Sequence, residues 1–279
     1  MKRNQQRQRG FSAVEMLIGA LAFTVTLISV ANLNIGVGRA ASAYERSNRL
    51  SRNTRISLDE GLFRLRGAES IQATQGTMTL GPTTAIFRLP AYNPNTPGFF
   101  LDNVYDTIVI TYDANNRQIL ETILPAIGSV RAPRSNWVIA REVTVANFDY
   151  YARQNFRALN TGNQTFTLGA PIAAANVTTT TSGTGPNAVV TTTVTGAQAY
   201  VNGMPTTFTY NPGNQSITVS CPARGADVQI LYPARPDNDG GSSRQLVTQV
   251  RLNLTLRNPT DENGTISLQG LALLRNRRD

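Results

Sequence analysis

The apolar positions of this chain form one long stretch near its start. A polar, basic segment at residues 1–10 runs directly into apolar residues, and no charged residue stands between Met16 and Gly38. Those 23 residues suffice for a helix to cross a bilayer, which takes about 20 residues. Lys and Arg on the N-terminal side favour an orientation with the rest of the chain outside the cytoplasm. We expect residues 11–38 to form a membrane-spanning helical segment.

Beyond residue 38 the apolar pattern becomes amphipathic, with apolar side chains recurring at helical spacings of three and four residues. These positions are Ala40, Ala43, Tyr44, Leu50, Leu58, Leu62 and Leu65, and Arg46, Arg49, Arg52, Arg55 and Arg64 take up much of the remaining surface. The first proline, a residue that breaks helices, is Pro82, and Gly67 is a residue type favoured just past a helix end. The pattern predicts one helix from Phe11 to Arg66, with an amphipathic half at 39–67.

A basic amphipathic helix can also bind DNA or lipid. The net charge of +9 suggests the same partners, but four of its cations lie in the first ten residues, which leaves +5 for the rest. Asp59 and Glu60 offset part of the helix charge. We therefore favour packing of this helix against other helices over binding of nucleic acid.

After Gly67 the chain is typical of strands and turns. β-branched and aromatic runs bounded by Pro, Gly, Asn and Asp lie at residues 85–89, 107–112 and 143–151. Residues 249–257 alternate polar and apolar as a half-buried strand does, and the stretch 270–277 follows them near the end of the chain. We expect an α+β fold in which the long helix packs on an antiparallel β domain formed by residues 68–159 and 236–279.

Residues 160–235 differ in composition and are predicted to be a β-rich insertion. Runs of threonine at 178–181 and 191–193 flank a Gly- and Pro-containing stretch, with little to bury. Short strands follow at even spacing, at residues 199–203, 207–210, 216–220 and 227–232, which favours a small β-sandwich or flap. The segment is faintly similar to small modules of phage tail fibres and surface proteins. It is either a surface that binds a partner or an inert elaboration of the sheet.

The composition removes several kinds of chemistry. The chain has no His, the commonest general base and metal ligand, so triads that need one are excluded. Its single cysteine, Cys221, cannot form an internal disulfide and is expected to be a small buried residue. No phosphate-binding glycine loop, nucleophile elbow or zinc spacing occurs. We expect no catalytic residues and no cofactor.

One carboxylate interrupts the apolar stretch, and its surroundings form a motif. Glu15 stands five residues after Gly10, within the apolar stretch. An unpaired charge at membrane depth costs about 2.5–3.5 kcal/mol. Snorkelling to the interface is one way to lower that cost. The run Gly10-Phe11-Ser12-Ala13-Val14-Glu15, with its basic leader and apolar continuation, resembles the cleavage and methylation motif of type IV prepilins and type II secretion pseudopilins. Ser12 and Ala13 replace the more frequent Thr and Leu, at positions where we expect the chemistry of the motif not to depend on side-chain identity.

The resemblance implies a function in assembly. A prepilin peptidase would remove the leader, residues 1–10, by cutting between Gly10 and Phe11, and would N-methylate Phe11. Glu15 would then pair with the terminal amine of a neighbouring subunit. The implied partners are other pilins, the peptidase, an inner-membrane assembly platform and the lipid bilayer. The implied location is the bacterial inner membrane, crossed once with the C-terminal domain outside the cytoplasm, and then a periplasmic or extracellular filament.

Two short stretches resemble particular members of this family. Residues 148–150 and 274–276 are similar to segments of PilW-type minor pilins and J-type pseudopilins, which implies a minor, low-copy subunit. A secretion or DNA-uptake pseudopilin remains an alternative. So does an anchored adhesin or DNA-binding module that uses residues 160–235.

Calcium is a weaker candidate ligand. Asp237 and Asp239 lie in a turn-like run rich in oxygen ligands, and residues 260–264 form a second one. Neither run has the full spacing of an EF-hand, and Asp, Asn and Gly are ordinary turn formers.

Overall fold

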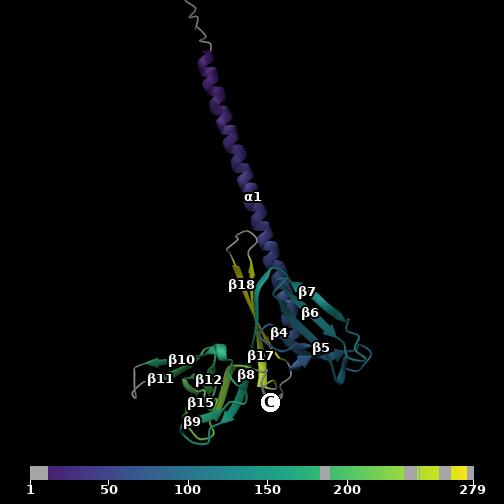
Figure 1. Ribbon diagram of the computed structural model, residues 1–279, viewed down its shortest axis with the longest axis vertical. Helices are drawn as coiled ribbons and strands as arrows, with labels where there is room; N and C mark the ends of the chain where they lie inside the picture. The colour runs from purple at the N-terminus through teal and green to yellow at the C-terminus, as the bar shows by residue number, and fades with distance from the viewer. Residues whose placement is uncertain (1–11, 183–188, 236–243, 245, 258–264, 275–279) are drawn as a thin grey trace, which may run out of the picture. The chain divides into compact units, whose positions relative to one another are not determined.

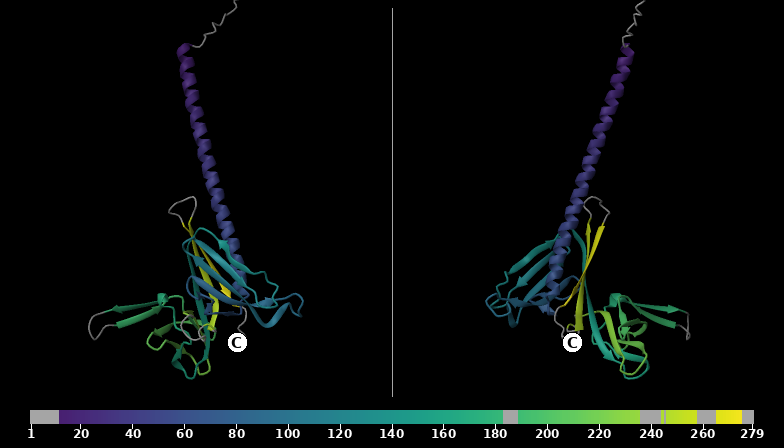
Figure 2. Two further views of the ribbon diagram at one scale, coloured as in Figure 1. Left: turned by 45° about the vertical axis from the view of Figure 1, so that its right-hand side comes forward. Right: turned by 180° about the vertical axis from the view of Figure 1, so that it is seen from behind.

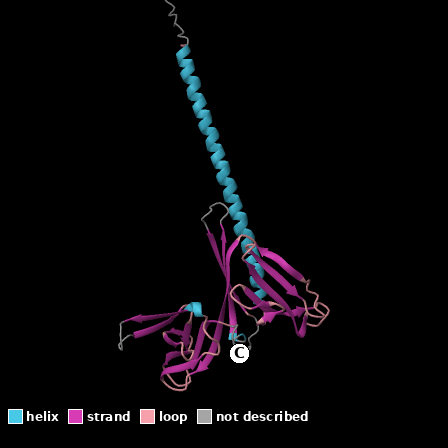
Figure 3. Cartoon of the chain, in the orientation of Figure 1, coloured by secondary structure: helices cyan, strands magenta, loops and turns pink. Residues whose placement is uncertain are grey.

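The computed structural model describes residues 12–182, 189–235, 244, 246–257 and 265–274. One long helix is followed by strands throughout (Figures 1 and 3). The elements are α1 (Ala13–Arg66), β1 (Ser70–Ile71), β2 (Thr74–Gln75), β3 (Met78–Thr79), β4 (Thr84–Tyr92), β5 (Phe100–Asp113), β6 (Gln118–Leu124), β7 (Arg134–Ala140), β8 (Val143–Arg157), β9 (Gly162–Thr167), η1 (Ala174–Asn176), β10 (Val177–Ser182), β11 (Val189–Val194), β12 (Gln198–Val201), β13 (Met204–Thr206), β14 (Phe208–Asn211), β15 (Ser216–Cys221), β16 (Asp227–Ala234), β17 (Val247–Arg257) and β18 (Thr265–Leu273).

The predicted helix is confirmed, since α1 is continuous from Ala13 to Arg66 and is seen whole from both sides in Figure 2. It ends where the amide of Gly67 donates to the carbonyls of Phe63 and Arg64. The strands are antiparallel, as expected for this α+β fold. They form a sheet in the order β1-β4-β5-β6-β7, a second in the order β13-β12-β16-β8-β17-β18, a third in the order β14-β15-β9, and the ribbons β2-β3 and β10-β11.

The strand predictions hold where the apolar pattern is strong. Each of the runs predicted at 85–89, 107–112, 143–151 and 249–257 lies inside one strand, namely β4, β5, β8 and β17. The pattern did not indicate β6, β7 or β9. The threonine runs, predicted to have little to bury, form the exposed ribbon β10-β11, in which Thr178, Thr179 and Thr180 face Thr193, Thr192 and Thr191.

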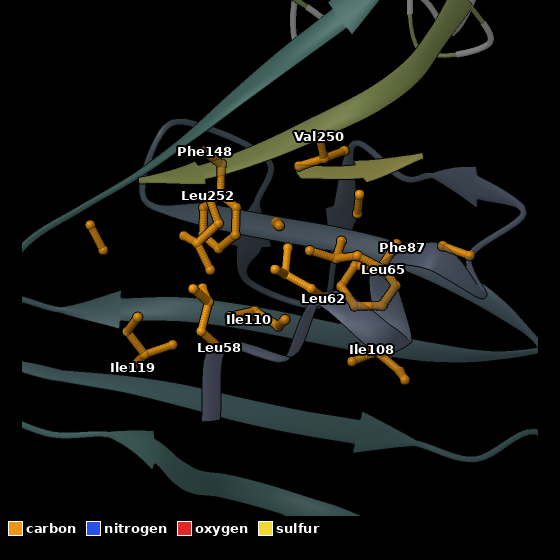
Figure 4. Packing of buried hydrophobic residues seen from close by; sticks show 14 of the residues in the cluster. Leu58, Leu62, Leu65, Phe87, Ile108, Ile110, Ile119, Phe148, Val250 and Leu252 are labelled. Atoms are coloured by element: carbon orange, nitrogen blue, oxygen red, sulfur yellow. The ribbon is translucent and has the colours of Figure 1, made fainter. Parts of the chain in front are cut away.

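The last turns of α1 lie in the main hydrophobic core. Leu58, Leu62 and Leu65 are buried, with Val250 and Leu252 of β17 on one side and Ile108 and Ile110 of β5 on the other (Figure 4). Both larger sheets therefore bury apolar side chains against the same helical segment. Removing apolar area of this kind from water contributes roughly 25 cal/mol per Å².

A second buried cluster lies among the strands of the Thr-rich region. Its largest buried members include Tyr232, Ile217 and Ile230, and it also contains Cys221, which is 1% exposed. Burial raises the pKa of that thiol, as expected for an inert buried cysteine. The cluster includes Ala152 of β8, because β16 pairs with β8 and so brings the Thr-rich region into the same sheet.

A buried carboxylate ties the end of α1 to the first sheet. Glu121 of β6 is 1% exposed and accepts from Arg64 of α1 through one oxygen and from Arg134 of β7, at 3.0 Å, through the other. Arg64 also donates to Glu60 at 2.7 Å. Every charge in this group has an opposite partner, the condition under which a buried carboxylate is tolerated.

Gly270 of β18 permits the close approach of the second sheet to α1. A Cβ at this position would overlap Cδ1 of Leu62 and lie 3.1 Å from its Cγ. We predict that Gly270→Ala lowers the free energy of unfolding by about 1–3 kcal/mol through overpacking. Urea denaturation of the detergent-solubilised protein measures this. Gly81→Ala, whose Cβ would meet nothing within 4 Å, is the matched control and should be close to neutral.

A double-mutant cycle separates this clash from a general loss of sheet stability. Leu62→Ala alone should cost about 2–5 kcal/mol because it leaves a cavity. In the Leu62→Ala background Gly270→Ala should cost far less, since its methyl group then has space. Strict additivity of the two substitutions would contradict the contact.

We predict that Glu121→Gln destabilises the fold far more than Glu60→Gln. Replacing the buried carboxylate leaves Arg64 and Arg134 short of an anionic partner, which costs about 3–5 kcal/mol for a buried pair. Glu60 contacts the same two arginines, but its side chain is 48% exposed, so its loss should cost at most about 1 kcal/mol. Equal effects in urea denaturation would show that burial of Glu121 is unimportant.

Candidate functional site

The first half of α1 exposes apolar side chains all around its surface. Thirteen large apolar residues between positions 14 and 37 are more than half exposed, namely Val14, Met16, Leu17, Ile18, Leu21, Phe23, Val25, Leu27, Ile28, Val30, Leu33, Ile35 and Val37. The segment Ala13–Arg49 reaches a mean hydropathy of 2.1, and it is a candidate for one membrane span by length and composition. A helix that is apolar all round needs an apolar environment.

The few hydroxyl groups in this segment are satisfied within the helix. Thr24, Thr26 and Ser29 each donate to the carbonyl four residues earlier, at 2.8 Å. Such bonds meet the requirement that polar groups find a partner where water is absent. The hydroxyls therefore do not prevent this surface from contacting lipid or another helix.

Glu15 and Ser12 cap the start of α1 reciprocally. The backbone amide of Ser12 donates to a carboxylate oxygen of Glu15 at 3.0 Å, and the amide of Glu15 donates to the hydroxyl of Ser12 at 3.2 Å. This is the capping box, which satisfies two helix-end donors that have no partner within the helix. The positive end of the helix dipole also favours a carboxylate here.

The capping box shows a function of Ser12 that the sequence analysis missed. The expectation for position 12 concerned the chemistry of cleavage and methylation and did not include helix capping, in which the Ser12 hydroxyl accepts from the Glu15 amide. The signal was readable, since Ser followed by Glu three residues later, just before an apolar run, is the sequence signature of such a cap. Thr, the more frequent residue at this position in the family resembled, would supply the same hydroxyl.

The amphipathic half of α1 is covered only near its end, among the side chains that the structure describes. Of the predicted apolar positions, Leu58, Leu62 and Leu65 are buried, whereas Tyr44 is 72% exposed. Arg49 pairs with Glu45 at 2.9 Å, and both side chains are largely exposed, so this pair contributes only about 0.3–0.5 kcal/mol. Ala40 and Tyr44 of the predicted stripe therefore face solvent in the single chain.

An open groove lies beside the last turn of α1. It has a volume of about 1390 Å³ and is lined by residues that include Phe63, Tyr92, Phe100 and Arg131. Phe63 is 75% exposed. The groove wall is held by Asp106, which is fully buried and accepts from Arg131 at 2.7 Å, from the hydroxyl of Ser129 and from the amide of Ala126. A concave surface with exposed aromatics is thus kept in shape without a partner.

Several predicted site residues lie outside the described part of the chain. These are the cleavage and methylation residues Gly10 and Phe11, and the calcium candidates Asp237 and Asp239. Among the residues that the structure describes, no group of three or more Cys, Asp or Glu side chains is arranged to hold a metal ion. Of the residues assigned to assembly, the structure places Glu15.

Comparisons with known proteins add no relative. No protein-family model, no curated protein and no solved structure matches this chain. The function is therefore argued from the residues of α1 and of the β domain alone.

We predict that Ser12→Ala frays the first turn of α1. Loss of an N-cap costs about 0.5–2 kcal/mol, which corresponds to roughly two- to thirty-fold faster exchange of the amides of Ser12 and Glu15. Hydrogen exchange of the protein in detergent micelles, read by mass spectrometry, measures this. Ser12→Thr keeps the hydroxyl and should exchange as the unaltered chain does. If Ser12→Ala left these amides equally protected, the capping box would not contribute to helix stability.

Proposed function

We propose that this protein is a minor pilin or pseudopilin, a subunit of a type IV pilus-like filament that is incorporated after cleavage between Gly10 and Phe11 and N-methylation of Phe11. The observation that carries the proposal is the helix α1. It exposes apolar side chains on every side of its first half, has one carboxylate at its start, and buries its last turns in a β core. Such a helix suits lipid first and neighbouring helices afterwards.

The chemistry of Glu15 supports a role in joining subunits. A carboxylate surrounded by apolar helices needs a cationic partner, because an uncompensated charge there costs several kcal/mol. An ionised carboxylate can accept about four hydrogen bonds, and in the single chain Glu15 accepts one from its own backbone region. The remaining capacity fits an ammonium group, such as the terminal amine that cleavage would create at Phe11 of a neighbouring subunit.

The β domain supports a subunit that faces outward from such a filament. In the proposed arrangement α1 crosses the bacterial inner membrane once, and the β domain lies outside the cytoplasm before and after assembly. The groove beside Phe63 offers a further contact for a neighbouring subunit. A secretion or DNA-uptake filament would use the same chemistry, so the proposal covers the class of filament subunit and not one system.

The cleavage step has a direct test. Mass spectrometry of the protein purified from membranes that contain a prepilin peptidase should show chains that begin at N-methylated Phe11. Chains that keep Met1, or that begin beyond residue 30, would contradict the proposal.

The assembly step is tested by comparing two glutamates of the same helix. We predict that Glu15→Ala leaves membrane insertion intact but reduces incorporation into filaments at least about tenfold, as expected for loss of a buried ion pair. Glu45→Ala is the matched control, because Glu45 is 68% exposed and pairs only with Arg49 among the described residues. Quantitative immunoblotting of sheared filaments against membranes measures incorporation. Normal incorporation of Glu15→Ala would remove the proposed role of this carboxylate.

A further inference from the structure

The Thr-rich region contains no charged residue over a long span. Between Arg157 and Arg224 the chain has no Lys, Arg, Asp, Glu or His, although 15% of all residues are charged. At that average these 66 residues would hold about ten charges. Exposed sheet surfaces and edges ordinarily carry charged side chains, which also prevent pairing with other chains. A β surface without charged side chains is therefore unusual, and its composition calls for an explanation.

One sheet in this region presents a regular array of neutral polar side chains. In β14-β15-β9 alternate residues, among them Phe166, Ile217 and Val219, point into the second hydrophobic cluster. The opposite face carries hydroxyl and amide groups only. Its accessible members are Thr209 and Asn211 of β14, Thr218 and Ser220 of β15, and Asn163, Thr165 and Thr167 of β9. Ser216 of β15 has the same orientation but is only 2% exposed, and its hydroxyl donates to Asn214.

The strand register places these side chains on a grid. Thr209, Thr218 and Thr165 stand side by side across the three strands. In the next row Asn211 and Thr167 lie on either side of the buried Ser216. The hydroxyls of Thr165 and Thr218 lie 2.8 Å apart. Rows and columns of such a sheet repeat at about 4.8 Å across strands and about 6.7 Å along them. We name this surface, made of the seven accessible residues above, the hydroxyl face.

The side chains of the hydroxyl face favour an uncharged ligand. Nucleic acids and anionic polymers are held mainly by Lys and Arg, and the hydroxyl face has neither, so the DNA-binding alternative for this region is disfavoured. Hydroxyls both donate and accept, and they match the hydroxyls of a neutral sugar without the cost of desolvating a charge. A repeating polymer would engage several rows at once, and such multivalency compensates for weak single contacts.

We propose that the hydroxyl face is a docking surface for a neutral polysaccharide. This goes beyond the assembly role of α1, because it concerns what the β domain contacts once it is outside the cytoplasm. The fold supports the face as a rigid unit, since the three strands share a buried core and β16 joins that core to β8. Deleting residues 160–235 would remove β16 with it, so the test uses substitutions on the face.

The test measures co-sedimentation of the detergent-solubilised full chain with three insoluble neutral polysaccharides, cellulose, chitin and starch granules. At least one should retain the protein, and retention should not change between low and high salt, because no charge is involved. Thr165→Val with Thr218→Val removes the two closest hydroxyls while keeping side-chain shape. It should weaken binding about tenfold, the effect of losing two hydrogen bonds.

A matched control comes from the ribbon β10-β11. Thr179 and Thr192 also face each other with their hydroxyls 3.4 Å apart, but they lie outside the hydroxyl face. Thr179→Val with Thr192→Val should bind as the unaltered protein does. Thr209→Glu, which puts a charge on the face, should bind to none of the three polymers. Thermal unfolding of each variant shows that the fold is kept.

Several outcomes would overturn the proposal. They are no retention by any of the three polymers, equal binding by the Thr165/Thr218 variant, equal loss in the ribbon control, or binding that disappears in high salt. Self-association through the uncharged edges of β9 and β14, detected by analytical ultracentrifugation in place of polymer binding, would overturn it too. None of these results touches the cleavage at Gly10 or the role of Glu15, which are measured separately.

Discussion

The contact between the last turns of α1 and the two larger sheets is the interaction on which the rest of the structure depends. Leu62 packs against β18 at Gly270, which has no side chain. Arg64, two residues further along the helix, forms an ion pair with the buried carboxylate of Glu121. The apolar contact supplies most of the free energy, since a buried ion pair alone is weak evidence for stability. The ion pairs instead fix which turn of the helix meets which strand.

The two ends of α1 need different environments, a β core at its end and an apolar surrounding at its start. A helix of 54 residues is about 80 Å long, far more than one β domain of this size can cover. Its end is covered by the chain's own strands, whereas its first half exposes mainly apolar side chains, together with internally bonded hydroxyls, Glu15 and two asparagines. In the single chain the capping box gives the carboxylate of Glu15 a backbone donor, the amide of Ser12. In the proposed filament, apolar neighbours around Glu15 would make an unpaired charge costly and would therefore favour a cationic partner.

The sequence predicts the parts of this structure that follow from local periodicity. The helix from residue 13 to 66 follows from a continuous apolar run and then from spacings of three and four residues, β17 from alternation, and β4, β5 and β8 from their β-branched and aromatic residues. The approach of β18 to Leu62 depends on a contact over two hundred residues apart, so nothing near Gly270 indicates it. β6 was missed because Glu121 interrupts its apolar pattern, and its partners are distant arginines. The helix cap formed by Ser12 could have been predicted from the Ser-x-x-Glu spacing.

The two proposed contact surfaces, the first half of α1 and the hydroxyl face, lie on separate elements. They differ in whether a charged side chain is needed. Assembly through α1 requires one charge in an apolar environment, so that a wrong register leaves Glu15 unpaired. Docking on β14-β15-β9 requires that charge be absent, so that neutral hydroxyls meet no desolvation barrier. β8 joins the two parts of the domain, with Phe148 in the main core and Ala152 in the second. The two cores therefore share one strand, but the outward side chains of β14-β15-β9 are not part of either core. Substitutions on the hydroxyl face should therefore alter binding without weakening the packing of Leu58, Leu62 and Leu65 in the main core.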